Sequence, residues 1–107
     1  MNQQRVFVVD GARTPFLKAR GSLGDFSATD LAVAAARPVL ARMPFAPTVF
    51  DEVIVGCVIA APDEANIARF IALRLGCGKS VPAYTVQRNC ASGLQALSNA
   101  RERIALG

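Results

Sequence analysis

The strongest chemical signal in this sequence is a cysteine between a strand-like run and a helix-like run. Residues 83–86 (AYTV) are typical of a buried strand, and from Leu94 onward apolar residues recur three or four positions apart, as on one face of a helix. Those apolar positions are Leu94, Leu97, Ala100 and Ile104. Cys90 is therefore predicted to lie at or just before a helix N-terminus.

A cysteine in that position is suited to nucleophilic chemistry. Unpaired backbone N–H groups and the positive end of the helix dipole favour the thiolate, which is the reactive form. The same N–H groups can bind the oxyanion that forms when a carbonyl is attacked. We expect a side chain in place of Gly93 to crowd the sulfur or a neighbouring segment. The alternative is a small buried cysteine that caps a core helix.

The residues around this cysteine, 89–96 (NCASGLQA), resemble the acyl-enzyme motif of the thiolases, the acetyl-CoA acyltransferases. Three other segments resemble the family in the same order along the chain. They are residues 6–16, with an Arg-Thr-Pro turn, residues 51–58, like its second strand, and residues 66–69, like the start of its second helix. Residues 81–86 then lead into the cysteine as they do in the family.

The resemblance implies acyl transfer between coenzyme A thioesters, with Cys90 as the catalytic nucleophile. Cys90 would attack the thioester carbonyl, and a second coenzyme A or an acetyl-CoA carbanion would accept the acyl group. The reaction is then 3-oxoacyl-CoA thiolysis or acetyl-CoA condensation, with the coenzyme A thioester as substrate and no cofactor. At position 87 many members carry Asn. Gln87 keeps the side-chain amide but adds a methylene, so it can change the exact position of the motif's residues without changing the family resemblance.

The length of the chain limits this interpretation. The chain has 107 residues and no histidine, whereas the family's chemistry, as the resemblance implies it, needs a histidine base and a second cysteine from motifs further downstream. We therefore expect residues 1–107 to be a partial thiolase N-terminal domain that carries the nucleophile, lacks the base and is inactive alone.

Strand-like and helix-like segments alternate along the chain, which predicts an α/β fold with a parallel sheet. The order is strand 5–10, loop 11–24, a helix from Ser27, Thr29 or Asp30 to about Leu40, strand 49–60, a helix opened by residues 62–64 and stopped by Gly76, strand 83–86, and the helix after Cys90. The resemblance implies the N-terminal part of a three-layer α/β/α domain. Its five-stranded sheet, in the order 3-2-4-5-1, would lack its fourth and fifth strands here.

Individual residues add expectations about the ends, bends and buried positions of these elements. Pro38 lacks a backbone donor and is expected to end or kink the first helix. Gly56 is expected to mark a bulge or a close backbone approach. The second helix is expected to bury Ile67, Phe70 or Ile71, and Leu75. Of the other cysteines, Cys57 is interpreted as a core residue and Cys77 as a turn residue.

The composition of the chain argues against several classes of binding partner and site. The apolar share of 52% suits strands that are buried on both faces. The basic residues behind the net charge of +4 are dispersed, which does not favour nucleic acid. No apolar run reaches the ~20 residues of a membrane span, and the N-terminus leaves no room for a signal peptide, so we expect a cytoplasmic protein. Without histidine or a CxxC spacing, no metal site is expected.

Other interpretations remain open. In the family the strand at residues 83–86 pairs across a dimer two-fold, which implies a homo-oligomer; the alternative is an ordinary edge strand of a monomer. A ketoacyl synthase also places a cysteine at a helix N-terminus. A redox or binding module could use Cys90 as a reactive thiol with Cys57 or Cys77 as the resolving partner. The chain could also be an inert fragment.

Overall fold

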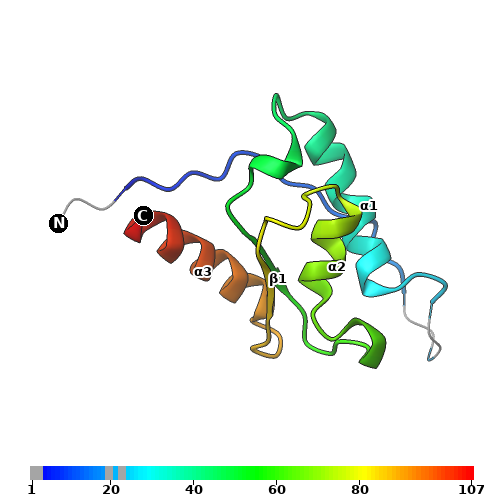
Figure 1. Ribbon diagram of the computed structural model, residues 1–107. Coiled ribbons are helices and arrows are strands. Elements are labelled where there is room, and N and C mark those ends of the chain that lie inside the picture. Colours follow the sequence, from blue (N-terminus) through cyan, green and yellow to red (C-terminus); the bar gives the residue numbers. More distant parts are fainter. Residues whose placement is uncertain (1–3, 19–20, 22–23) are drawn as a thin grey trace.

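The computed structural model describes residues 4–18, 21 and 24–107, so part of the predicted loop 11–24 and the first three residues lie outside the described residues. The elements are α1 (Ala28–Ala41), β1 (Val53–Gly56), α2 (Ile67–Arg74), β2 (Ala83–Val86) and α3 (Ser92–Leu106), with 3₁₀ turns at Pro47–Val49 and Pro62–Glu64. Figure 1 shows α3 on one side of the strands and α1 and α2 on the other. The predicted three-layer α/β arrangement is confirmed in this part of the domain.

The two strands form a parallel sheet in which Val53 lies opposite Ala83 and Gly56 opposite Val86. The strand predicted at 83–86 is confirmed, but the strand predicted at 49–60 is too long, because β1 has four residues. A strand continues only while a neighbour satisfies its backbone groups. After Gly56 only the N–H of Cys57 still reaches Val86, the last residue of β2.

The first helix begins with a capping box, and of the three capping residues that the sequence left open, Ser27 is the N-cap. The Ser27 hydroxyl accepts from the Asp30 N–H at 3.0 Å, and the Asp30 carboxylate accepts from the Ser27 N–H at 2.9 Å. Pro38 does not end this helix, which continues to Ala41. The missing donor of a proline in the last turn removes a single helical hydrogen bond, and the remaining turn tolerates that loss.

The second helix begins later than predicted, because Pro62–Glu64 form a separate 3₁₀ turn before Ile67. Ile71, not Phe70, is the buried one of the two expected positions, and Gly76 ends the helix in the left-handed conformation at φ +82°. Leu75 packs against the core from a half-buried position.

Two apolar clusters hold the layers together. The first consists of Val33, Ile67 and Ile71, and the second of Ala72, Cys77 and Val81. Cys57 packs against the first cluster, as predicted. Cys77 is 2% exposed, so its interpretation as a mere turn residue was wrong. It follows the turn that ends α2 and points back into the core.

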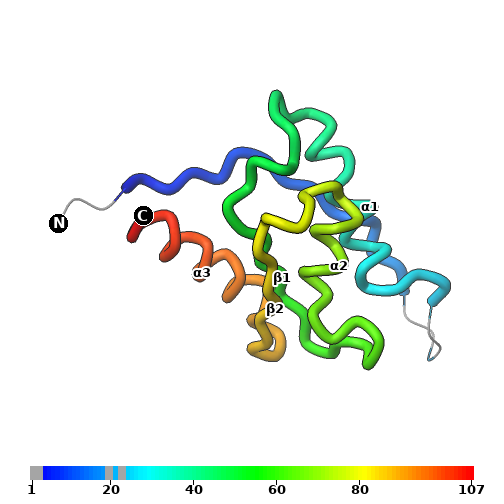
Figure 2. The backbone as a smooth tube through the Cα atoms, in the orientation of Figure 1, coloured from blue at the N-terminus to red at the C-terminus, as the bar shows by residue number. Residues whose placement is uncertain are grey.

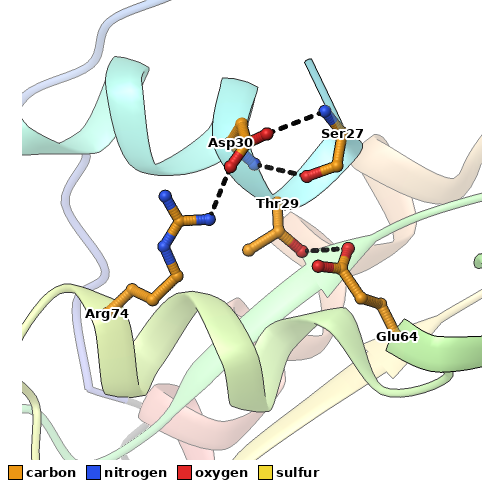
Figure 3. A network of polar contacts seen from close by, with 5 residues as sticks. All are labelled: Ser27, Thr29, Asp30, Glu64 and Arg74. Carbon is orange, nitrogen blue, oxygen red and sulfur yellow. Dashed lines mark hydrogen bonds and ion pairs between the residues drawn. The ribbon is translucent and has the colours of Figure 1, made fainter. Parts of the chain in front are cut away.

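A polar network joins α1 to the segment that carries α2 (Figure 3). The Thr29 hydroxyl, on a fully buried residue, donates to the Glu64 carboxylate at 2.7 Å. Arg74 donates to Asp30 at 2.7 Å, so the capping residue of α1 also holds the end of α2. These contacts fix the packing of the two helices on their side of the sheet.

The predicted strand at residues 5–10 is not formed within the described chain. Phe7, Val8 and Val9 are 73%, 90% and 81% exposed in an extended segment that Figure 2 shows running apart from β1 and β2. A strand needs a neighbour for its backbone groups, and none of the described segments pairs with this one. An ion pair between Asp10 and Arg42 holds its far end, with contacts of 3.0 and 3.1 Å.

A groove of about 840 Å³ lies between β1 and α3. Its apolar lining includes Phe50, Ile54, Ala96, Leu97, Ala100 and Ile104. Leu94 and Leu97 of the predicted apolar face are 72% and 64% exposed, so most of that face is open to solvent. None of the described helices combines the length and apolar character needed to cross a membrane.

Candidate active site

Cys90 lies on the turn between the end of β2 at Val86 and the start of α3 at Ser92, as predicted. We call residues 87–91 the cysteine turn. The side chain of Cys90 is exposed. This exposure contradicts the alternative of a buried cysteine that caps a core helix, and it leaves the sulfur accessible to a substrate carbonyl.

The buried hydroxyl of Ser92 closes the cysteine turn. Its oxygen accepts from the N–H of Arg88 at 2.8 Å and its proton goes to the carbonyl of Asn89 at 2.6 Å. Two backbone bonds repeat the closure, from Ala91 to the Arg88 carbonyl at 3.0 Å and from Ser92 to the Asn89 carbonyl at 3.1 Å. Residues before and after Cys90 are thus tied to the first residue of α3.

The residue before the nucleophile has a left-handed backbone. Asn89 has φ +47°, the one positive value among non-glycine residues of the described chain, and asparagine tolerates this region better than most residues. The side-chain oxygen of Gln87 accepts from the N–H of Asn89 at 2.6 Å. Gln87 therefore takes part in shaping the turn.

A chain of side-chain hydrogen bonds runs from the cysteine turn along α3 to β2. Arg88 Nη1 donates to Gln95 Oε1 at 2.7 Å, and Gln95 Nε2 donates to Asn99 Oδ1 at 2.7 Å. Asn99 Nδ2 then donates to the Tyr84 hydroxyl at 3.2 Å. The Gln95–Asn99 and Asn99–Tyr84 bonds are partly buried, so solvent competes less with them than at an open surface, whereas the Arg88–Gln95 bond is exposed.

The start of α3 lies directly against β1. A Cβ added to Gly56 would overlap the backbone carbonyl of Ser92 and approach the backbone nitrogen of Gly93 to 2.6 Å. The predicted close approach at Gly56 is confirmed. The expectation for Gly93 was wrong, because a Cβ there would meet, apart from its chain neighbours and the nearby backbone of α3, no described atom within 4 Å.

The N-terminus of α3 offers donors beside Cys90. Among the hydrogen bonds of the described residues, none takes the N–H of Gly93 or Leu94, which belong to the first turn of the helix. Both residues are exposed as a whole, and the backbone nitrogen of Gly93 lies beside Gly56 of β1. Such donors are suited to a developing oxyanion.

The other two cysteines lie in different surroundings. All three are free thiols, with Cys57 half-buried and Cys77 buried. Burial raises the pKa of the Cys77 thiol. Across the residues that the structure describes, no group of three or more His, Cys, Asp or Glu side chains is arranged to hold a metal.

Sequence reasoning identified Cys90 but missed the residues that hold its turn. Ser92 and Gln95 entered the sequence-based prediction only as members of the motif at residues 89–96. The pairing of Arg88 with Gln95 had no signal in the sequence, because the two residues are seven positions apart and Arg88 precedes the helix.

Comparison with known proteins places the chain among sequences of one kind. The family model described as "Thiolase, N-terminal domain" matches residues 6–107. The human mitochondrial 3-ketoacyl-CoA thiolase is 42% identical over 100 residues, which are 92% of this chain and 25% of the relative. The acetyl-CoA acetyltransferase of Allochromatium vinosum is 39% identical over 104 residues, 97% of this chain and 26% of the relative.

The solved structures that resemble this chain are also thiolases. The Acat5 thiolase from Ascaris suum, crystallised with coenzyme A, superposes with a TM-score of 0.82 at 30% identity, covering 91% of this chain and 25% of that one. The human mitochondrial 3-ketoacyl-CoA thiolase gives a TM-score of 0.71 at 38% identity, over 77% of this chain and 21% of that one. The chain thus spans about a quarter of the length of the curated relatives it matches.

Proposed function

The chain belongs to the thiolase family, and from that premise we propose that it supplies the nucleophile, Cys90, for acyl transfer between coenzyme A thioesters. The observation that carries the proposal is the exposed cysteine on a closed turn immediately before α3. Its open position gives a thioester carbonyl access, and the hydrogen bonds of Ser92 hold its neighbours in place.

In the proposed step the Cys90 thiolate attacks the carbonyl carbon of an acyl-CoA, and a new C–S bond forms. The carbonyl electron pair moves to oxygen, where the N–H groups of Gly93 and Leu94 are available as donors. The oxyanion then collapses, the bond to coenzyme A breaks, and the departing thiolate takes up a proton. The acyl group remains on Cys90 until a second coenzyme A or an acetyl-CoA carbanion accepts it.

We propose that the base for this chemistry comes from outside residues 1–107, because the resemblance implies a histidine base and this sequence contains no histidine. The described surface supports completion by further residues. The groove beside β1 and the exposed Phe7, Val8 and Val9 leave apolar area and strand edges uncovered, which a larger domain would bury. We therefore propose that residues 1–107 act as part of a thiolase N-terminal domain.

The names of the relatives help to choose between the alternative reactions and families. Their names include both 3-ketoacyl-CoA thiolase and acetyl-CoA acetyltransferase, so thiolysis and condensation both stay within the proposal. Those names favour a thiolase over a ketoacyl synthase. Pairing of β2 with a second copy, a cytoplasmic location and the absence of a cofactor also remain proposals.

A chimera tests the function directly. Residues 6–107 replace the matching quarter of the human mitochondrial 3-ketoacyl-CoA thiolase, and thiolysis of a 3-oxoacyl-CoA is measured. We expect turnover that Cys90→Ser abolishes and Cys57→Ser, the matched control, preserves. General acid–base help is worth ~10²–10⁴-fold, so the 107-residue chain alone should stay near background. Robust turnover by the chain alone, or by the Cys90→Ser chimera, would overturn the proposal.

A further inference from the structure

We infer that Gln95 is a positioning residue for Cys90, acting through Arg88 to brace the cysteine turn; the inference rests on the proposed role of Cys90 as nucleophile. Arg88 is held twice. Its backbone N–H donates to the Ser92 hydroxyl at 2.8 Å, and its guanidinium donates to Gln95 at 2.7 Å. Both acceptors belong to α3, so the chain just before Cys90 is anchored to the helix just after it.

The guanidinium sets the direction of the hydrogen bonds. Arginine carries donors only, so Gln95 must present its Oε1 to Arg88 and its Nε2 to Asn99. Asn99 then has its Nδ2 left for the hydroxyl of Tyr84. Gln95 thus connects the cysteine turn with β2, the strand that enters it.

Cys90 depends on such supports because no hydrogen bond found within the described chain involves its own side chain. Its position is set through its neighbours Asn89 and Ala91. A misplacement of ~1 Å in a reacting group can cost ~10²-fold in rate. A brace that restricts Arg88 therefore affects how often the sulfur occupies an attacking position, without touching substrate.

The first test uses amide hydrogen exchange in the 107-residue chain. In Gln95→Leu, which keeps the size but removes both polar atoms, we expect the N–H groups of Ala91 and Ser92 to exchange at least ~3-fold faster, since a lost charge-assisted bond changes a local equilibrium by about that factor or more. Amides of α2 should not change. Gln95→Glu should restore protection, because a carboxylate also accepts from Arg88. Arg101→Gln, at an exposed position of the same helix, is the matched control.

Arg88→Met removes the donor of the Arg88–Gln95 bond. Because Arg88 is exposed and lies outside α3, this variant still tests the bond if Gln95→Leu disturbs the helix. Because both changes break the Arg88–Gln95 bond, and Gln95→Leu also removes the bond to Asn99, the double variant should exchange no faster than Gln95→Leu alone. Additive effects, an unchanged exchange rate in Gln95→Leu, or no rescue by Gln95→Glu would overturn the inference.

In the chimera, Gln95→Leu should lower kcat by ~10-fold with KM changed less than ~2-fold, the pattern of lost positioning. Equal kcat values would overturn the inference. The two proposals fail separately. If Cys90 is never acylated while the exchange results hold, the proposed function fails and the brace stands; if acylation proceeds and exchange does not respond, the brace fails alone.

Discussion

Gly56 of β1 and Ser92 of α3 touch through their backbones, with no room between them for a Cβ on Gly56. Ser92 is also the residue whose hydroxyl closes the cysteine turn. The sheet therefore sets the position of the nucleophile through the glycine at the end of β1. Any side chain there must displace the start of α3 or the strand.

The first prediction compares two glycines on the two sides of this contact. Gly56→Ala should destabilise the chain by about 1–3 kcal/mol, the usual cost of overpacking. Gly93→Ala enters open space and should be neutral or stabilising by up to ~1 kcal/mol, because alanine favours the helix. Urea unfolding measures both variants. Equal stability of the two would show that the contact yields without cost.

The second prediction concerns the buried hydroxyl of Thr29. Thr29→Val keeps the side-chain shape but removes the donor to Glu64, so the free energy of unfolding should fall by roughly 1–2 kcal/mol. Thr48→Val, at an exposed position, is the control. If both variants unfold at the same urea concentration as the parent chain, the Thr29–Glu64 bond contributes nothing to stability.

The third prediction ranks the cysteines by reaction with iodoacetamide. Cys90 is exposed, Cys57 half-buried, and Cys77 buried with its pKa raised by burial. At neutral pH Cys77 is thus both inaccessible and held as the thiol, so labelling should proceed in the order Cys90, Cys57, Cys77. Each lies on its own tryptic peptide, so timed mass spectrometry resolves them. Early labelling of Cys77 would show that the core opens readily.

The fourth prediction follows the ion pair of Asp10. The hydrogen bond from Arg42, with that from the Gly11 N–H, holds the pKa of Asp10 below its ordinary value of 3.8. A carboxyl with a lowered pKa contributes stability that is present above the unfolded-state value and is lost as pH falls through the folded-state value. The contact should therefore persist at neutral pH and break only below about 3.8.

The Gly11 amide proton resonance reports this contact in an acid titration. Asp10→Asn removes the carboxylate, and its Gly11 signal should stay at the detached position at every pH. A parent signal that does not move in acid would mean that the pair does not hold the N-terminal segment.

The sequence predicted best what depends on neighbours along the chain. The strand at 83–86, a helix start within residues 27–30 and the position of Cys90 ahead of a helix follow from local pattern and capping chemistry. The strand expected at 5–10 was wrong because a strand also requires a partner, and no described segment supplies one. Local pattern carries no information about whether that partner is present.

Details of the site were harder to predict for the same reason. The clash at Gly56 and the freedom at Gly93 depend on how α3 packs on β1, which neither segment reveals alone. The bond between Arg88 and Gln95 exists because the cysteine turn folds back on α3. The use of coenzyme A thioesters, the oligomeric state and the cellular location stay predictions.

The most direct test of the account is the site of acylation. The chimera is incubated with labelled acetyl-CoA, quenched in acid and digested with trypsin, which places Cys90 on the peptide 89–101, separate from Cys57 and Cys77. We predict a single acetyl group on that peptide, lost in Cys90→Ser and retained in Cys57→Ser. Acetyl on Cys57 or Cys77 with none on Cys90 would contradict it.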